Sequence, residues 1–504
     1  MTKTRAQKTA DKDLLRISSF VLFDAAVYHE VLAGSPLRIT SLRKATDPIQ
    51  RFLDTEWAKV LAINYEPVFG LAREVLNAFP SSPDTETILH KIAETAIGVV
   101  SSGVLLRHDF MGRVYHKLLL RTTRHYYATY YTSIPAAWLL ANLAVKTPHN
   151  RWDFTSVERI REFRLIDPAC GSGTLLSAAY MAIKDQYVMA RPPALDLDEF
   201  HRALVEDVIH GWDVLDYASH LTLTTLSLHS NRTRIKDSNI LTLPAGVDQT
   251  GVHLGSLDVL SHGRAIVGRG FTTPAMRKGM EGGRERHVEP DKELAKYDLV
   301  IMNPPFSRSA KPNRKFGYSR PDIRKIMNKA LGDLAKEIGA VGIGQAGLGA
   351  HFMLLGLSLA KADGRIGVVI PRSMLSGVSW GKVRADYTAN ATIEYVVSNY
   401  DPGNLQEGIE PWNWSENTDI GEVLIVAERT DIPRAERRDA IYVNLWRKPK
   451  NEVEALLVGH QVIRARNSLS GSVWSCPGFV ESDWLGYYAP LLPSPLVLRR
   501  RAVL

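Results

Sequence analysis

The hydrophobic positions follow two different periods along the chain. Up to about residue 120 they recur every three or four residues, with SSPD and GSP as turn signals, in the stretches LLRISSFVLFDAAVYHEVL, EWAKVLAINYEPVFGLAREVLNAF and ETILHKIAETAIGVVSSGVLL. This spacing places apolar side chains along one face of a helix. Residues 1–120 are therefore predicted to form a helical N-terminal domain, whose sequence points to no chemistry of its own.

From about residue 160, short apolar runs alternate with helical stretches. The expected strands are FRLID, VIHGWDV, RIKDSNIL, YDLVIM, RIGVVIP, TIEYVVSN and GEVLIVAE, and the expected helices include TLLSAAYMAIKDQY, ASHLTLTTLSLHS and AHFMLLGLSLAKADG. This alternation predicts an α/β fold with a doubly wound, mostly parallel sheet over residues 121–430. Residues 245–290 show neither period and are expected to be a mobile insertion, and residues 431–504 to be a C-terminal extension available to DNA or a partner.

The positive charge of the chain is concentrated in one segment. The formal net charge is +8, and residues 306–325 alone carry seven basic residues against one acid. Phe306, Phe316 and Tyr318 interleave with these cations, as expected where a phosphate backbone is bound and bases are stacked. A solvated loop is the alternative, but a nucleic acid is favoured because the segment follows a candidate ligand site. The candidate DNA-binding residues are Arg308, Lys311, Arg314, Lys315 and Arg320.

Cysteine and histidine usage narrows the class further. Cys170 and Cys476 are the two cysteines of the chain, which fits a protein of the reducing cytoplasm. The 15 histidines are scattered without the spacing of metal ligands, so no metal is predicted. No apolar run reaches the length of a membrane span, and no membrane partner is expected.

The stretch LIDPACGSGTLL, residues 165–176, predicts a ligand loop. A strand ends on Asp167, and Gly171 and Gly173 precede a helix whose amino terminus favours an anionic group. Leu176 stands where the dinucleotide fingerprint requires a third glycine, so a nicotinamide enzyme is disfavoured. Asp213 and Asp237 follow the next two expected strands, where acids can accept hydrogen bonds from a ribose or an adenine.

The stretch YDLVIMNPPF, residues 297–306, ends a buried strand on a rigid polar corner. The two prolines fix φ and keep the preceding residue out of helical geometry. The strand therefore presents an amide and an aromatic ring at its carboxyl end, where open α/β sheets bind ligands.

These motifs resemble those of the amino-methyltransferases that use S-adenosylmethionine, and in particular the adenine-N6 DNA methyltransferases. DPACGSG is similar to their cofactor loop, NPPF to their catalytic motif, and HYYATYYTSIPAAWLL to their Tyr-Thr-Pro segment. Their order, continued by GRIGVVIPRSML and preceded by a helical domain, most resembles the modification subunits of type I restriction-modification systems. Ser133 stands where the family usually has proline, and the insertion before Asn303 is long.

The resemblance implies a Rossmann-like methyltransferase sheet and a role for each matching residue. Tyr131, Thr132 and the loop from Asp167 to Gly173, with Ala169, Gly171 and Ser172, would hold the methionine end of S-adenosylmethionine. Asp213 would hold its ribose and Asp237 its adenine. The catalytic residues would be Asn303, Pro304, Pro305 and Phe306: the Asn303 oxygen and the Pro304 carbonyl accept the hydrogens of the target amine, while Phe306 stacks on the flipped base.

Other functions share this corner. An NPP-aromatic motif also occurs in enzymes that methylate guanine-N2 in RNA or glutamine in proteins, and a DNA-binding subunit without turnover would keep the same fold. The basic segment and the helical domain favour double-stranded DNA. About 75 residues follow GEVLIVAERT, few for a target-recognition domain. We therefore expect a separate specificity subunit, with a restriction subunit as a further partner, unless the chain is one piece of a longer protein.

Overall fold

The structure is a computed structural model of the 504-residue chain. It describes residues 5–33, 39–63, 66–102, 131–146, 152–192, 195–230, 233, 235, 237–261, 266–270, 284–307, 315–317, 319–399, 413–416, 418, 420–433, 436–437, 440–445, 448–469, 478–481 and 485–489.

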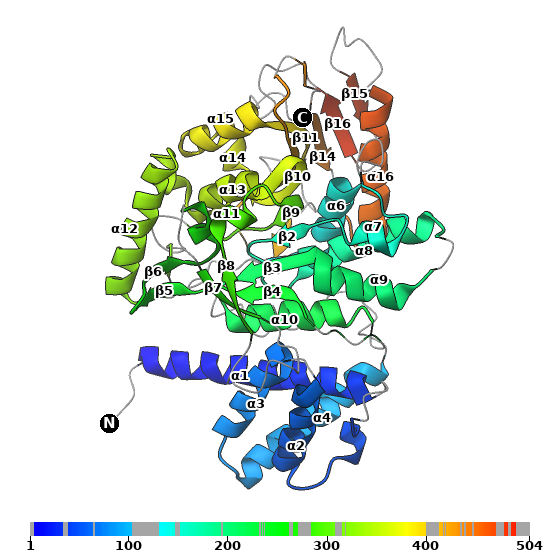
Figure 1. The fold of residues 1–504 in the computed structure, drawn as a ribbon, viewed down its shortest axis with the longest axis vertical. Coiled ribbons are helices and arrows are strands. Elements are labelled where there is room, and N and C mark those ends of the chain that lie inside the picture. The colour runs from blue at the N-terminus through cyan, green and yellow to red at the C-terminus, as the bar shows by residue number, and fades with distance from the viewer. Residues whose placement is uncertain are drawn as a thin grey trace, which may run out of the picture.

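The helices fall into an N-terminal group and a group that surrounds the sheet (Figure 1). The N-terminal group is α1 (Arg5–Ala33), η1 (Leu42–Lys44), α2 (Ile49–Ile63), α3 (Glu66–Ala78) and α4 (Pro83–Ser101). The second group is α6 (Ile134–Val145), α7 (Val157–Ile160), α8 (Thr174–Met189), α9 (Leu197–Ala203), η3 (Leu204–Val208), α10 (Asp216–Ser227), η4 (Gly255–Leu260), α11 (Pro290–Glu293), α12 (Pro321–Glu337), η6 (Ile343–Ala346), α13 (Leu348–Leu359), α14 (Ser373–Ser376), η7 (Val378–Trp380), α15 (Gly381–Asn390) and α16 (Glu452–Leu469).

Most strands of the described residues join one sheet. Its twelve strands run in the order β15-β16-β14-β11-β13-β10-β9-β2-β3-β4-β7-β8, and β1 pairs with β12 and β5 with β6 outside it. Their bounds are β1 (Tyr131–Thr132), β2 (Leu165–Asp167), β3 (Ile209–Asp213), β4 (Asn239–Thr242), β5 (Ala245–Asp248), β6 (Gly251–Leu254), β7 (Ile266–Gly270), β8 (Arg284–Val288), β9 (Tyr297–Met302), β10 (Ala360–Pro371), β11 (Ala391–Asn399), β12 (Ser415–Glu416), β13 (Glu422–Arg429), β14 (Ile441–Leu445), β15 (Gly478–Glu481) and β16 (Leu485–Ala489).

The centre of the sheet is parallel, as predicted. β4, β3, β2, β9 and β10 pair in parallel, and so do β11 and β14. β13 lies antiparallel between β10 and β11, so these two strands point the same way. The eight strands from β4 to β14 therefore share one direction except for β13. The carboxyl ends of β2, β3 and β9, which carry the candidate residues, lie at one edge.

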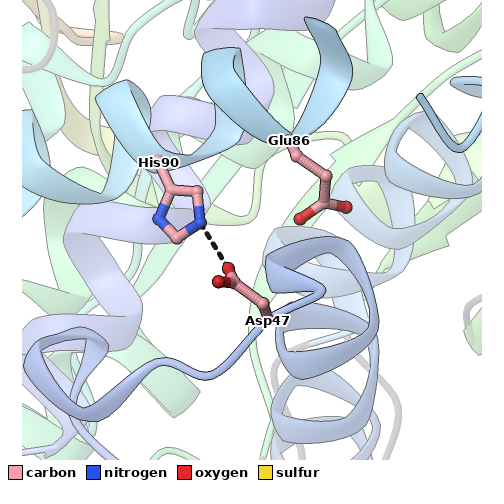
Figure 2. Close-up of side chains that lie close together, drawn as sticks. All are labelled: Asp47, Glu86 and His90. Carbon is pink, nitrogen blue, oxygen red and sulfur yellow. Dashed lines mark hydrogen bonds and ion pairs between the residues drawn. The ribbon is translucent and has the colours of Figure 1, made fainter. Parts of the chain in front are cut away.

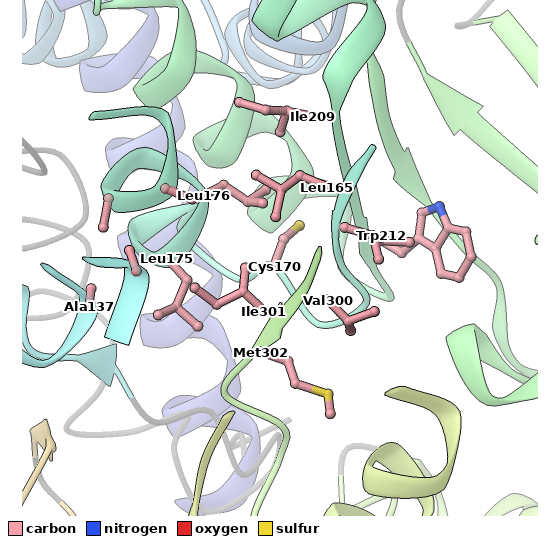
Figure 3. Packing of buried hydrophobic residues seen from close by; sticks show 14 of the residues in the cluster. Ala137, Leu165, Cys170, Leu175, Leu176, Ile209, Trp212, Val300, Ile301 and Met302 are labelled. Carbon is pink, nitrogen blue, oxygen red and sulfur yellow. The ribbon is translucent and has the colours of Figure 1, made fainter. Parts of the chain in front are cut away.

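Helices cover both faces of this sheet. Gly367 of β10 faces Leu140 and Ala144 of α6, while its neighbour Ile366 lies against Gly356 of α13. Successive residues of a strand point to opposite faces, so α6 and α13 lie on opposite sides. Figure 3 shows the buried packing between β2, β3, β9 and the helix α8, in which Leu165, Leu176, Ile209 and Ile301 are fully buried. This two-sided burial explains the continuous apolar runs of the central strands.

The N-terminal helices pack against α10, below the sheet in Figure 1. Asp24 of α1 and His220 of α10 are both fully buried, with 2.6 Å between Oδ2 and Nε2. The Thr224 hydroxyl donates to the same carboxylate at 3.1 Å. The helical region is thus joined to a helix that, as shown below, also supports the candidate ligand loop. No helix of the described residues is long and apolar enough to cross a bilayer.

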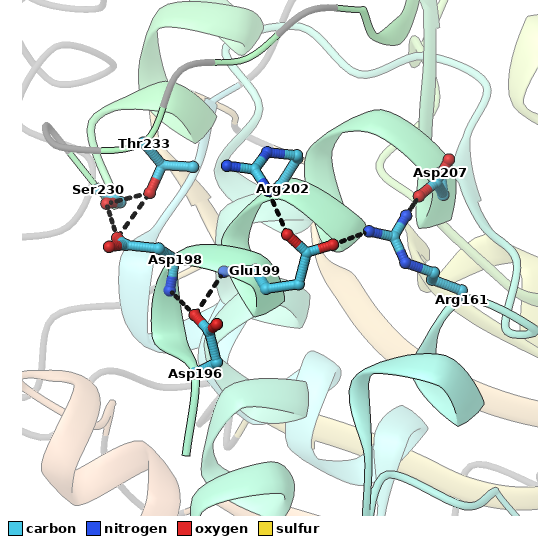
Figure 4. A network of polar contacts seen from close by, with 8 residues as sticks. All are labelled: Arg161, Asp196, Asp198, Glu199, Arg202, Asp207, Ser230 and Thr233. Carbon is cyan, nitrogen blue, oxygen red and sulfur yellow. Dashed lines mark hydrogen bonds and ion pairs between the residues drawn. The ribbon is translucent and has the colours of Figure 1, made fainter. Parts of the chain in front are cut away.

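A polar network ties α9 to its neighbours (Figure 4). Glu199 bridges Arg161 and Arg202, and Arg161 also pairs with Asp207. Asp198 accepts hydrogen bonds from Ser230 and Thr233. These partly exposed pairs fix the segment between α8 and β3.

Three parts of the fold differ from the sequence-based expectation. Within residues 245–290, expected to be irregular, the described parts form β5, β6, η4, β7 and β8, and β7 pairs with β4 at the edge of the main sheet. Short strands of four or five residues rich in glycine give too few positions to reveal a period. In addition, β10 begins at Ala360, so AKADG belongs to this strand and not to the preceding helix. Within residues 431–504, expected to be an extension, β14 and β16 continue the main sheet beside β11.

Candidate functional site

The loop after β2 turns sharply through two glycines. Gly171 has φ of 54° and Gly173 has φ of 77°, values that side-chain-bearing residues seldom adopt. A Cβ added at Gly173 would lie 3.0 Å from the Thr222 Cα, whereas one added at Gly171 would meet no described atom within 4 Å. Gly173 therefore allows the loop to pack on α10, and Gly171 borders open space at the amino terminus of α8.

Two threonine side chains of α10 hold the loop by donating to its backbone carbonyls. The Thr222 hydroxyl donates to the Gly171 carbonyl at 2.8 Å, and the Thr225 hydroxyl donates to the Ser172 carbonyl at 3.2 Å. The Ser172 hydroxyl lies 2.8 Å from that of Thr174, inside the first turn of α8. These contacts fix the loop and leave the space beside Gly171 open.

Two of the predicted acids lie on either side of this loop. Asp167 is buried and accepts the Ala169 N–H at 2.9 Å. Asp213, at the end of β3, accepts the N–H groups of Gly171 and Leu215, each at 3.0 Å. Burial raises the pKa of Asp167 well above its usual value, and the charge of Asp213 raises it further. Burial raises the pKa of Asp213 to about 6. A cationic ligand would relieve this concentration of negative charge.

The remaining predicted cofactor residues do not all lie at the edge that carries Asp167 and Asp213. Asp237 is partly exposed just before β4, where it accepts the Ser238 N–H at 2.9 Å. β4 runs parallel to β3 with Asn239 opposite His210 and Thr242 opposite Asp213, so Asp237 lies before the amino end of β4 and away from the edge where β3 ends on Asp213. The prediction that Asp237 ends a strand is therefore wrong, because β4 begins two residues after it. Tyr131 and Thr132 form β1 and are buried. Thr132 reaches the catalytic corner, as described next.

The corner after β9 is enclosed by the start of α13. A Cβ at Gly347, which has φ of 83°, would lie 1.7 Å from the Ser307 carbonyl oxygen, so the helix can approach this closely because residue 347 is glycine. The Leu348 N–H donates to the Ser307 hydroxyl at 3.2 Å. This contact fixes the chain just beyond Phe306.

The Asn303 amide is oriented by two hydroxyl groups. Its Nδ2 donates to Thr132 Oγ1 at 2.8 Å and to Ser415 Oγ at 3.0 Å. Its Oδ1 is buried and has no hydrogen-bond partner among the described residues. Both amide hydrogens are thus used inside the protein, and the oxygen is left as a free acceptor.

The other residues of the corner differ in exposure. Pro304 is buried and Pro305 partly exposed. Phe306 is 3% exposed, within the hydrophobic core. Because a stacking platform must offer a ring face, a base can reach Phe306 only after its covering groups move.

The basic segment is described in part. Arg308, Lys311 and Arg314 lie outside the described residues. Lys315 is partly buried and donates to the Gly344 carbonyl at 3.0 Å, and burial lowers its pKa. Arg320 is exposed and pairs with Asp322 at 2.6 Å. Of the candidate DNA-binding residues, the two that the structure describes, Lys315 and Arg320, therefore both have partners within the chain.

Four site residues were not predicted from the sequence. Ser415 and Glu422 act at the corner, while Thr222 and Thr225 support the loop. The threonines occur on an expected helix, where a polar residue facing a predicted loop is a usable signal. Ser415 follows no expected strand, and nothing local marks it.

A separate cluster lies among the N-terminal helices (Figure 2). Asp47, Glu86 and His90 offer ligand atoms that all lie within 4.8 Å of one another. The His90 Nε2 is 2.7 Å from the Asp47 Oδ1, and Glu86 accepts the Ile49 N–H at 2.6 Å at the start of α2. These contacts attach the turn before α2 to α4.

Part of the chain is similar to a known protein family. Residues 257–403 match the Eco57I restriction-modification methylase family. The match includes Asn303 and the corner that follows β9, so this part of the chain is similar to restriction-modification methylases. No curated protein matches the sequence.

The chain is also similar to several solved structures. The chain is similar to the type IIG restriction endonuclease BpuSI, with 14% identity and a TM-score of 0.50 over 92% of this chain and 43% of that one. It is also similar to the type ISP restriction-modification enzyme LlaBIII bound to DNA, with 12% identity and a TM-score of 0.49 over 88% of this chain and 30% of that one. The M protein of the type I restriction enzyme EcoKI has 12% identity and a TM-score of 0.37 over 89% of this chain and 71% of that one. The chain thus spans less than half the length of BpuSI.

Proposed function

We propose that this protein is a restriction-modification methylase that transfers a methyl group from S-adenosylmethionine to the N6 amino group of adenine in DNA. The orientation of the Asn303 amide carries the proposal. Both of its hydrogens are donated inside the protein, and its buried Oδ1 remains as an acceptor. An exocyclic amine offers hydrogens to such an acceptor.

The corner suits the chemistry of this amine. Its lone pair is delocalised into the base, which makes it a weak nucleophile. Acceptance of its two hydrogens by the Asn303 Oδ1 and the Pro304 carbonyl draws the nitrogen toward tetrahedral geometry as it attacks. The prolines restrict the backbone that carries both acceptors, so little reorganisation is needed.

The loop after β2 fits S-adenosylmethionine, which supplies an activated methyl group on a cationic sulfonium. Open space beside Gly171 lets the backbone approach a ligand closely. Asp167 and Asp213 place two carboxyl groups at this point, and their raised pKa values indicate that positive charge would be favoured there. Asp213 would hold the ribose, and Thr132 with the loop the methionine end.

The family match and the basic segment favour DNA over RNA or protein as the acceptor. The assembly we propose is double-stranded DNA with a separate specificity subunit and a restriction subunit, in the cytoplasm. The recognised DNA sequence would then be read by the specificity subunit.

The test compares host DNA from cells with and without the gene, and with Asn303→Ala in its place. Sequencing that detects methylated bases is expected to find N6-methyladenine at one motif in cells with the parent gene, and in neither of the other two strains. Labelled S-adenosylmethionine given to DNA, RNA and protein extracts from the same cells separates the alternatives. Label in RNA guanine or protein glutamine, with none in DNA adenine, would overturn the proposal.

A further inference from the structure

The two hydroxyls that hold the Asn303 amide belong to directly paired residues. β1 and β12 form a short antiparallel ladder in which Thr132 lies opposite Ser415. Opposite residues in such a ladder place their side chains on one face, with Cβ atoms about 4.5–5.5 Å apart. A single amide nitrogen fits between these hydroxyls, as the distances of 2.8 and 3.0 Å show.

A hydroxyl alone does not decide which end of an amide faces it, because it can donate or accept. For Ser415 the neighbouring Glu422 decides. The Ser415 N–H donates to Glu422 Oε2 at 2.6 Å, the other carboxyl oxygen, Oε1, is buried without a partner among the described residues, and the Ser415 hydroxyl lowers the pKa of this group. An ionised carboxylate can only accept. The Ser415 hydroxyl therefore gives its hydrogen to Glu422 and keeps its oxygen for the hydrogen of Asn303.

We propose that Ser415 and Glu422 are positioning residues that hold the Asn303 amide with its oxygen toward the substrate amine. The inference rests on the proposed function, since it concerns the same methyl transfer. Each hydrogen bond of the chain runs in one direction, from Asn303 Nδ2 to Ser415 and from Ser415 to Glu422. If the chain reversed, Asn303 would present a donor to an amine that also donates, and the attack would lose its acceptor.

Protonation of Glu422 can reverse the direction of its hydrogen bond with Ser415. Glu422 is fully buried at the start of β13, and burial raises its pKa to about 7, opposed by hydrogen bonds from Ser415 and Trp414 and by the charge of Lys448. The other charged groups nearby are Glu416, which interacts with Lys448, and Arg372, whose guanidinium packs on Gly421. A protonated Glu422 can donate to Ser415 and permit the reversed chain. Turnover at saturating cofactor is therefore expected to fall as the pH drops through about 7.

The first test is single-turnover methylation of DNA by the protein with its partner subunits, at saturating S-adenosylmethionine and over a range of pH. Ser415→Ala should lower the rate by about 10- to 100-fold, as residues that orient a reacting group usually do, with cofactor affinity unchanged. Ser415→Thr, which keeps the hydroxyl, should restore most of the rate. Glu422→Gln should lose the acid limb of the profile, because an amide does not titrate.

The matched control is Ser398→Ala. Ser398 is a buried serine of β11, next to β13, and its hydroxyl bonds to Val443 and Asn444 instead of the corner. This variant should keep both the parent rate and the parent pH profile. If Ser415→Ala and Glu422→Gln also keep them while the parent methylates adenine, the positioning role is wrong and the proposed function stands.

A second measurement does not depend on activity. With asparagine labelled by ¹⁵N, the side-chain amide signal of Asn303, identified by its loss in Asn303→Ser, should shift as the pH passes about 7. It should stay in place in Glu422→Gln. A signal that does not shift in the parent protein, or that shifts equally in Glu422→Gln, overturns the inference. Failure to find a methyl acceptor would overturn the proposed function and is a separate result.

Discussion

The cofactor loop and the catalytic corner follow neighbouring strands, β2 and β9, yet they are held in different ways. Hydrogen bonds fix the loop through its backbone. Most of their donors and acceptors lie between Asp167 and Thr225, and the Ser256 hydroxyl also donates to the Pro168 carbonyl at 2.6 Å. The corner is fixed through the Asn303 side chain, by Thr132 and Ser415, which are 171 and 112 positions away in sequence. Damage to the loop should therefore change cofactor affinity, and damage to the corner should change turnover.

The largest effect is expected for Asn303→Ala. It removes the acceptor that is needed most as the amine becomes tetrahedral, so single-turnover methylation should fall by about two to three orders of magnitude. Cofactor affinity, measured by calorimetry, should stay nearly constant because the loop has its own supports. A parent-like methylation rate for Asn303→Ala would end the proposed mechanism. A large loss of cofactor affinity would show instead that the two regions are one unit.

The next effect tests the loop through Gly173→Ala. The new Cβ meets the Thr222 Cα at 3.0 Å on a backbone with positive φ, and such strain costs about 1–3 kcal/mol. Cofactor affinity should weaken by roughly 5- to 150-fold. Gly98→Ala in α4 is the control, because its Cβ would have no described neighbour within 4 Å and alanine favours a helix. Equal cofactor affinity for the two variants would show that the loop tolerates repacking.

A third prediction concerns the pH dependence of cofactor binding. The pKa of Asp213 is about 6 in the free protein, and a bound cation should lower it, so binding releases a proton near this pH. Affinity should fall as the pH drops through about 6, by at most about tenfold per unit. Calorimetry in buffers of different ionisation enthalpy measures the released proton. Asp213→Asn should bind more weakly and release fewer protons, and an unchanged pH profile in this variant would assign the titration to another group.

The same contrast explains what the sequence could predict. β2, β3, β9 and the glycine loop were predicted, because a buried parallel strand is a continuous apolar run and a tight turn requires glycine. The polar corner at Asn303 was visible for similar local reasons. The contact of Ser415 with Asn303 was not predicted, because Ser415 lies in a two-residue strand without a period and reaches Asn303 only through the pairing of β1 with β12. Lys315 shows the same limit of sequence-based prediction. Its place in a basic segment suggests a phosphate contact, whereas in the structure it donates to the Gly344 carbonyl.

The smallest effect separates two threonines on one helix. Thr222 donates to the Gly171 carbonyl of the loop, whereas Thr224, two residues later, donates to Asp24 of the N-terminal helices. Thr222→Val should weaken cofactor binding by about 0.5–1.5 kcal/mol, the usual net contribution of one hydrogen bond. Thr224→Val should instead lower the melting temperature and leave cofactor affinity unchanged, because the buried Asp24 carboxyl group loses a hydrogen-bond donor. Calorimetry and thermal unfolding of both variants give the comparison. If Thr224→Val weakens cofactor binding as much as Thr222→Val does, then α10 transmits the state of the N-terminal helices to the loop, and cofactor affinity depends on those helices as well.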